Sequence, residues 1–127
     1  MTVGNYYTGS SITTSRINGA GTAPIYGQLA TGTGAAAGVS AMNTPTNDAR
    51  VAGTPSIVTT TLTNDTYQVV FTTTLGTGAT VTQVALWDAA GTGTPATGGT
   101  MFFIAEFAGI VLAAGDSLTA TCKTKFA

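Results

Sequence analysis

Charge is scarce in this sequence of 127 residues. Four Lys and Arg and five Asp and Glu make up 7% of the chain, whereas charged residues are about 25% of a typical soluble domain. Nucleic acids and acidic membranes attract proteins mainly through electrostatic fields, and so few charges produce a weak field. No run of apolar residues approaches the length of a membrane span either. We therefore expect neither a nucleic-acid partner nor a membrane partner.

Histidine is absent, and cysteine occurs once, at Cys122. The chain thus lacks the commonest general base and the commonest metal ligand. A single thiol can form neither an intramolecular disulfide nor a cysteine-based zinc or iron–sulfur site. These absences predict a protein without a metal or another cofactor.

The carboxylates do not form an evident catalytic pair, which would need two of them held together. Asp65, Asp88 and Asp116 stand at positions where turns favour Asp. Glu106 lies inside an expected strand, where we expect it to face outward. The full set comprises Asp48, Asp65, Asp88, Glu106 and Asp116. We predict that the protein is not an enzyme and has no catalytic residues.

Threonine, alanine and glycine dominate what is present. The apolar fraction is 43%, the mean hydropathy is +0.31 and the net charge is −1, whereas disordered chains combine low hydrophobicity with high charge. Thr, Val, Ile and aromatic residues favour strands, and good helix formers are few. The composition therefore predicts an ordered all-β protein.

The chain divides near Gly53. Residues 1–53 are small and polar with weak periodicity, apart from short apolar islands such as 12–17, and we expect them to form an extended N-terminal arm that is poor in strands. Residues 54–127 show the alternation of strands and frequent Gly and Asp turns. We predict an antiparallel β-sandwich there, either jelly-roll or immunoglobulin-like. Its expected strands are 57–62, 67–75, 81–88, 101–107 and 117–126.

Alternation also assigns side chains to faces. In the last strand Leu118, Ala120 and Cys122 share the apolar face, which favours burial of Cys122 over a bridge between two chains. Lys123 and Lys125 lie on the opposite face. They indicate either an edge strand protected by lysine or a docking site for an acidic partner.

The aromatic residues allow two interpretations. We expect Trp87, Phe102, Phe103 and Phe107 to pack in the core or an interface, and we place Met101 on one face with Phe103. A stacking platform for sugars is the alternative, since sugars need no charged partner.

Three segments resemble small β-sandwich proteins of bacteriophage virions. Residues 81–89 are similar to a strand of the pattern I-T-E-V-G-L-F-D-A, with Gln83 in place of the acidic residue and Ala85 in place of glycine. Residues 112–118 are similar to a strand that opens L-x-A-G-D-x-L. The three segments are 64–70 (NDTYQVV), 81–89 (VTQVALWDA) and 112–118 (LAAGDSL). The virion proteins that these segments resemble include capsid decoration (cement) proteins and tail-fibre-associated modules.

This resemblance implies a structural role in a virion. The expected function is to bind the outside of the capsid and stabilise it by bridging capsomers. The expected partners are the major capsid protein and further copies of the chain, as a homotrimer. No signal peptide is visible, so we expect synthesis in the host cytoplasm and a final location on the outer capsid surface. A tail or fibre module that binds a host glycan or another tail protein is the alternative. Candidate partner contacts are Tyr6, Tyr7, Arg16, Arg50, Lys123 and Lys125.

Overall fold

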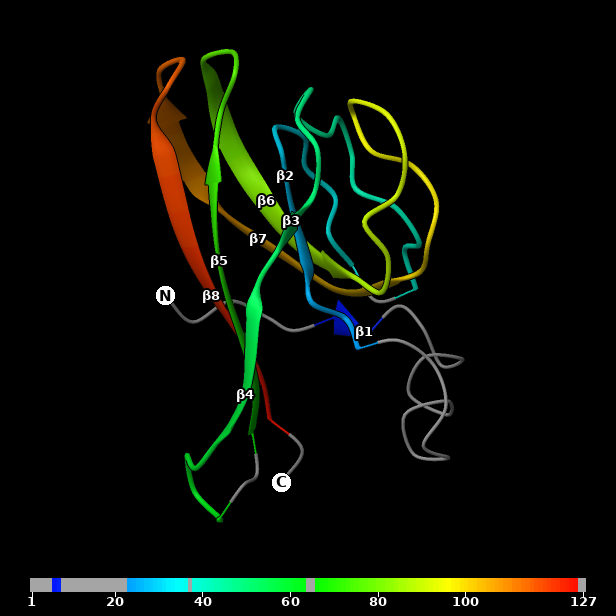
Figure 1. Cartoon of the computed structure of the whole chain (residues 1–127), viewed down its shortest axis with the longest axis vertical. Helices are drawn as coiled ribbons and strands as arrows, with labels where there is room; N and C mark the ends of the chain where they lie inside the picture. Colours follow the sequence, from blue (N-terminus) through cyan, green and yellow to red (C-terminus); the bar gives the residue numbers. More distant parts are fainter. Residues whose placement is uncertain (1–5, 8–22, 37, 64–65, 126–127) are drawn as a thin grey trace.

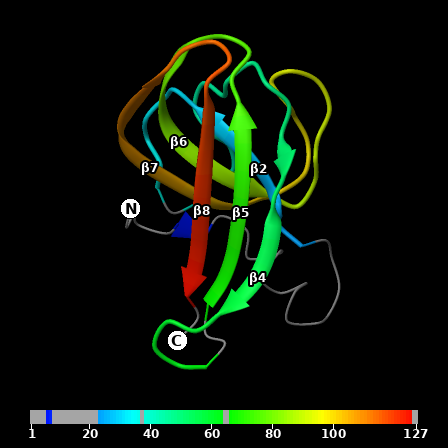
Figure 2. The same cartoon turned by 60° about the vertical axis from the view of Figure 1, so that its left-hand side comes forward.

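A computed structural model describes residues 6–7, 23–36, 38–63 and 66–125. These residues form two antiparallel sheets and no helix, which confirms the predicted all-β sandwich (Figures 1 and 2). The strands are β1 (Tyr6–Tyr7), β2 (Tyr26–Ala30), β3 (Val51–Ala52), β4 (Thr54–Val58), β5 (Thr66–Thr74), β6 (Ala79–Trp87), β7 (Met101–Leu112) and β8 (Ser117–Lys125). One sheet has five strands in the order β1-β7-β6-β2-β3, and the other has three in the order β4-β5-β8.

The three-stranded sheet is built on a regular ladder between β5 and β8. Nine residue pairs run without a bulge from Thr66 opposite Lys125 to Thr74 opposite Ser117. The ladder ends in the predicted turn at Asp116, whose Oδ2 accepts a hydrogen bond from the Ala113 N–H at 2.9 Å. Gly115 has a φ of 88°, which glycine adopts readily. The alternation in the sequence thus predicted this pair of strands correctly.

The main core lies between the two sheets. Its buried members are Leu29, Val69, Phe71, Leu75, Val81, Val84, Leu86, Phe102, Phe103, Ala105 and Cys122. A second core lies on the other face of the five-stranded sheet, under the segment that follows β2. Its buried members are Ala30, Met42, Ala85, Trp87, Met101 and Ile104. Strand β6 is therefore buried on both faces.

A bulge explains one error in the predicted faces. The register between β6 and β7 shifts after Leu86, which pairs with Phe103, so that Trp87 pairs with Met101. The extra residue, Phe102, stays with the main core. Met101 moves to the second core, away from Phe103. A bulge reverses the alternation of side chains, so the prediction that Met101 and Phe103 share a face is wrong.

The expected boundary at residue 53 is wrong for residues 23–36 and 38–53. Strand β2 lies inside the five-stranded sheet and pairs with β6 along all of its length, from Tyr26 opposite Trp87 to Ala30 opposite Gln83. A β-carbon at Gly27 would lie 2.4 Å from three ring atoms of Phe71. A glycine is therefore needed in β2 because the Phe71 ring packs directly on its backbone. Residues 54–127 alone do not make up the sandwich.

The remaining differences concern strand limits. The strand expected at 57–62 begins earlier, at Thr54, and ends at Val58. Its Pro55 is compatible with β4 because this strand is an edge of its sheet. Strand β7 continues past the expected end at residue 107 to Leu112. The island at 12–17 lies outside the described residues.

Candidate interaction groove

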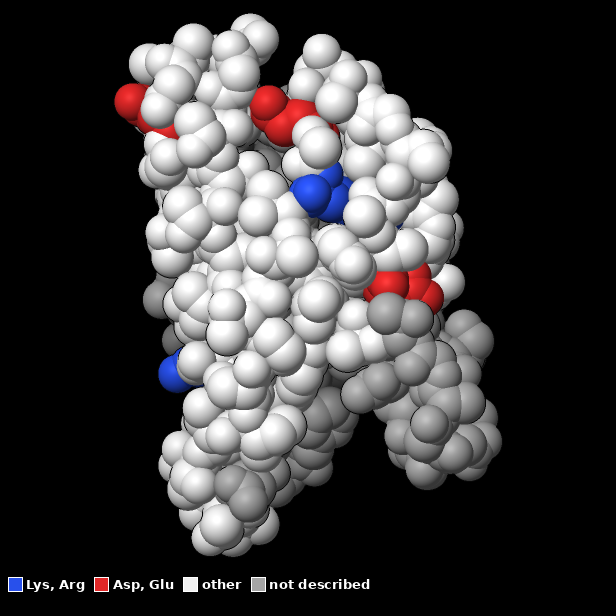
Figure 3. Space-filling view, in the orientation of Figure 1, with Lys and Arg blue, Asp and Glu red and all other residues white. Residues whose placement is uncertain are grey.

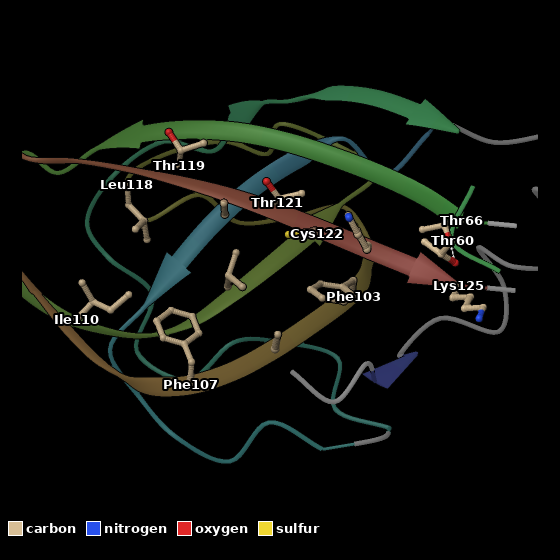
Figure 4. A pocket seen from close by; sticks show the side chains of 14 residues that line it. Thr60, Thr66, Phe103, Phe107, Ile110, Leu118, Thr119, Thr121, Cys122 and Lys125 are labelled. Atoms are coloured by element: carbon tan, nitrogen blue, oxygen red, sulfur yellow. Dashed lines mark hydrogen bonds between the residues drawn. The ribbon is translucent and has the colours of Figure 1, made fainter. Parts of the chain in front are cut away.

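A groove opens on the side of the sandwich where β8 ends the three-stranded sheet. It has a volume of about 670 Å³ and lies between β8 on one side and β6 and β7 on the other (Figure 4). Pockets of 300–1,000 Å³ are the usual size of ligand sites. The apolar lining comprises Val84, Phe103, Ala105, Phe107, Ile110, Leu118, Ala120 and Cys122. The groove is thus an apolar cavity large enough for several side chains of a partner.

The floor of the groove is the side of the main core. Val84, Phe103 and Cys122 line it and are each about 95% buried, with exposures of 5%, 4% and 4%. Nearer the mouth, Phe107 and Leu118 are only half-buried although they pack against the same core. Among the described residues the sheets hold unequal numbers of strands, and within that part of the chain no strand lies opposite the five-stranded sheet beyond β8. The groove therefore results from the sheet topology.

One end of the groove is polar. Thr60 and Thr66 lie there with their hydroxyls 2.9 Å apart, and Lys125 donates a hydrogen bond to the Thr61 hydroxyl. Figure 4 shows Lys125 at this end, and Phe107, Ile110 and Leu118 at the other. Lys123 and Lys125 are exposed and border the groove. Strand β8 is an edge strand among the described residues, the position that the protective interpretation of its lysines requires. Their predicted partner contact stays a prediction.

Cys122 is buried in the floor of the groove, as predicted. Burial raises the pKa of its thiol to about 12, because an apolar environment disfavours the charged thiolate. The thiolate is the reactive form of cysteine. Cys122 therefore acts as a small apolar side chain of the core.

Arg50 was predicted to contact a partner, but the structure places it inside the protein. It is 7% exposed. Its Nε donates to Gln28 Oε1 at 3.0 Å, and its Nη1 donates to the carbonyls of Ala89 and Gly98 at 2.9 and 2.8 Å. Its guanidinium lies 3.7 Å from the centroid of the Trp87 ring. Burial lowers the pKa of Arg50, and the neighbouring carboxylate of Asp88 opposes that shift.

The role of Arg50 is therefore structural. It joins β2 to the segment between β6 and β7 through a planar group with several fixed donors. The only sequence signal for this role is a lone arginine in a charge-poor chain, which does not identify its partners.

The aromatic residues form core contacts, as expected. Trp87, Phe102 and Phe103 are buried, with exposures of 7% or less. Phe107 is half-buried and lines the groove. A sugar platform that uses Trp87 and Phe103 is therefore wrong, because neither ring offers an exposed face.

We expected Glu106 to face outward; it is half-buried and has hydrogen-bond partners that the sequence does not indicate. Its Oε2 accepts hydrogen bonds from the Gly34 and Ala35 N–H groups at 2.8 and 2.9 Å. The side chain of Gln83 donates to it at 3.3 Å and accepts from the Asn43 N–H at 3.1 Å. The pKa of Glu106 is lowered chiefly by the Ala35 N–H and then by Gln83; desolvation opposes this shift, and the Gly34 N–H adds the smallest lowering effect. Glu106 thus fixes the segment that covers the second core.

Three other carboxylates stabilise turns. Asp48 accepts from the Gly76 N–H at 3.0 Å, and Asp88 accepts from the Thr100 N–H at 2.7 Å. Asp116 closes the turn before β8, as described above. Asp65 lies outside the described residues. Among the described residues, no group of three or more His, Cys, Asp and Glu is arranged to hold a metal ion.

The remaining predicted contact residues are at the N-terminus. Tyr6 and Tyr7 form β1, which pairs with Ile104 and Phe103 at the edge of the five-stranded sheet. Arg16 lies outside the described residues. The sequence reasoning missed the groove residues Phe107, Ile110 and Ala120, because which strands face each other is a property of the folded topology.

Comparisons with known proteins identify no family and no relative of this chain. The chain matches no family model, no curated protein and no solved structure. The part of the chain that the structure describes also contains no helix long and apolar enough to cross a membrane.

Proposed function

We propose that this chain is a structural protein of a bacteriophage particle that binds the outer surface of the capsid and bridges neighbouring capsomers. The observation that carries the proposal is the apolar groove on the open side of a charge-poor sandwich. The similarity of residues 64–70, 81–89 and 112–118 to virion β-sandwich proteins supports the setting. The major capsid protein and further copies of the chain, as a homotrimer, are the proposed partners.

The character of the surface supports this function. Figure 3 shows isolated charged residues on a largely uncharged face. On the outer face of the three-stranded sheet, hydroxyls pair with each other: Thr72 with Thr119 at 2.7 Å and Thr74 with Ser117 at 2.6 Å. Burying polar or charged groups is costly when they lose water without gaining a partner. Hydroxyls that are already paired reduce this cost when a neighbouring subunit covers the sheet.

The proposed mechanism is mechanical. Each bound copy buries apolar surface at a junction between capsomers, and burial contributes about 25 cal/mol per Å². A shell repeats each contact many times by symmetry. Many such contacts raise the barrier to separating the capsomers, so the decorated shell resists heat better than the bare shell.

A decoration assay tests the function. Purified protein is mixed with phage shells that lack it, and the bound fraction is measured by sedimentation and the shell rupture temperature by light scattering. We expect saturable binding and a higher rupture temperature. Bovine serum albumin at the same concentration is the control for non-specific protein effects. Failure to bind, or binding without a gain in rupture temperature, contradicts the proposal.

A further inference from the structure

Among the described residues, the large apolar side chains that are exposed lie in two places. Val111 of β7 is 80% exposed, and Ile57 of β4 is 58% exposed. Leu62, in the turn that follows β4, is 60% exposed. Single exposed apolar residues scattered over a surface are ordinary, whereas apolar residues that gather at one place mark a contact with another molecule. We therefore compared the surroundings of β4 and β7.

The backbone of both strands can pair with a further strand. In the described part of the chain, β4 pairs with β5 alone, and β7 beyond Ile104 pairs with β6 alone. Residues 110–112 of β7 form regular pairs with β6, so this end of the edge is suited to pairing. Pro55 offers no N–H, so a strand beside β4 would pair around Ile57. An edge strand without a neighbour is a template for pairing with another chain.

Neither edge carries the charges that usually protect an edge strand. Residues 51–63 and 107–115 contain no Lys, Arg, Asp or Glu. The carboxylate of Glu106, earlier in β7, is held by the Gly34 and Ala35 N–H groups. Charged residues, lysine above all, discourage pairing between edge strands. A second copy of the chain can therefore approach either edge without opposing like charges.

Strands β4 and β7 lie on opposite sides of the sandwich (Figure 2). Gly53 alone separates β3 from β4, and β3 and β7 lie toward opposite ends of the five-stranded sheet. Figure 1 shows that β4 and the turn after it extend beyond the body of the sandwich. Matching patches on opposite sides of a chain join copies head to tail, and such contacts form a ring when the rotation between copies closes.

We infer that β4 of one copy pairs with the outer edge of β7 of the next copy, in the alignment that brings Ile57 beside Val111. The five-stranded sheet of one copy then continues into the three-stranded sheet of its neighbour, and the exposed side chains of both edges become buried. The inference rests on the proposed function for the number of copies, a trimer that closes into a ring. The partner at this contact is a second copy of the chain.

Charge variants of the two exposed residues test the contact. Ile57→Lys and Val111→Glu each place one charge on one edge, and a double variant carries both substitutions. Thr119→Lys and Thr119→Glu are the matched controls, because Thr119 is exposed on β8, outside the proposed contact. Circular dichroism and thermal unfolding select the variants that are folded. Sedimentation velocity then measures their oligomeric state, and the decoration assay measures their binding to bare shells.

We expect the wild type and both Thr119 variants to sediment as trimers. Each single variant at Ile57 or Val111 should associate about tenfold or more weakly, because the contact would bury a charge without a partner. The double variant should regain trimers, since its opposite charges face each other across the contact. A two-fold contact of β7 with β7, or of β4 with β4, brings like charges together and is not rescued by the double variant.

The outcomes separate this contact from capsid binding. Trimers that the single variants lose and the double variant regains support the inference. If the wild type is monomeric or dimeric, if the single variants remain trimeric, or if the double variant stays dissociated, the inference is overturned. Shell binding by the wild type with a gain in rupture temperature then leaves capsid binding standing. If trimers respond as expected but bind no shell, the contact stands and the proposed function is overturned.

Discussion

Replacing Arg50 should destabilise the protein severely, although arginine is usually a surface residue. Arg50→Met keeps the apolar stem and removes the guanidinium. The side-chain oxygen of Gln28 and the carbonyl oxygens of Ala89 and Gly98 then lose their donor, and the Trp87 ring loses its cationic neighbour. A hydrogen bond to a charged group contributes about 1.5–3 kcal/mol, and a desolvated cation–π contact about 2 kcal/mol.

These contributions are not additive, because removing the guanidinium also removes the cost of burying its charge. We therefore expect Arg50→Met to lower the free energy of unfolding by about 3 kcal/mol, a large part of the roughly 5–15 kcal/mol of a typical domain. Arg50→Lys keeps the charge but cannot reproduce the planar set of donors. Arg50→Lys should therefore lower the free energy of unfolding by about 2 kcal/mol.

Urea unfolding measures both variants. With a slope of about 2 kcal/mol per M urea, the midpoint of Arg50→Met should fall by about 1.5 M. Trp87 is the only tryptophan of the chain, so its fluorescence follows the site itself, and far-UV circular dichroism follows the whole fold. Lys123→Met removes the same charge from an exposed position and should stay within about 0.5 kcal/mol of the wild type. An Arg50→Met protein as stable as this control refutes the reasoning.

Three further predictions concern other parts of the fold. Gly27→Ala should cost about 1–3 kcal/mol in urea unfolding because its β-carbon would meet the Phe71 ring, and Phe71→Leu in the same chain should recover part of this loss; strictly additive effects contradict the contact. The pKa of Glu106 is lower in the folded protein than its value of about 4.5 in the unfolded chain. Glu106 therefore stabilises the fold at pH values above about 4.5, and this stabilisation is lost as the pH falls through the folded-state pKa. The urea midpoint of Glu106→Gln should therefore decline less steeply than that of the wild type between about pH 5 and pH 3. An unchanged decline contradicts a stabilising role of the hydrogen bonds to Glu106. Native Cys122, with a pKa of about 12, should resist a thiol-specific dye at pH 8 and react after unfolding; rapid labelling of the native protein contradicts its burial.

The regular parts of the fold were predictable because their signals are local. Tyr67, Val69 and Phe71 share one face of β5, and Leu118, Ala120 and Cys122 alternate with polar residues along β8. Gly115 and Asp116 mark the turn between β7 and β8 by residue type alone. In these segments the apolar residues indicate the buried face by their spacing, although Thr66, Thr73 and Thr124 are buried as well.

Strand β2 was not predictable in the same way. Its sequence, YGQLA, is too short and too poor in large apolar residues to differ from a linker. Its burial depends on Phe71, which lies far away in the sequence and packs on Gly27. The contacts of Arg50 and Glu106 depend likewise on segments that only the folded chain brings together.

The groove was unpredictable for a further reason. Leu118 and Ala120 were correctly placed on an apolar face, but a sequence does not state how many strands each sheet receives. In the described part of the chain, the open side follows from a sheet of five strands that faces a sheet of three. The bulge that moves Met101 away from Phe103 is a similar effect of strand pairing, which alternation alone does not reveal.

The position of the groove at the side of the core links occupancy to unfolding. Because Cys122, Phe103 and Val84 belong to the core and also line the groove, unfolding destroys the site completely. A ligand that binds only the folded chain stabilises it by about 2.7 kcal/mol at a free concentration of one hundred times its dissociation constant. Melting temperature therefore serves as a binding signal for this protein: a segment that occupies the groove should raise it in proportion to the logarithm of its concentration.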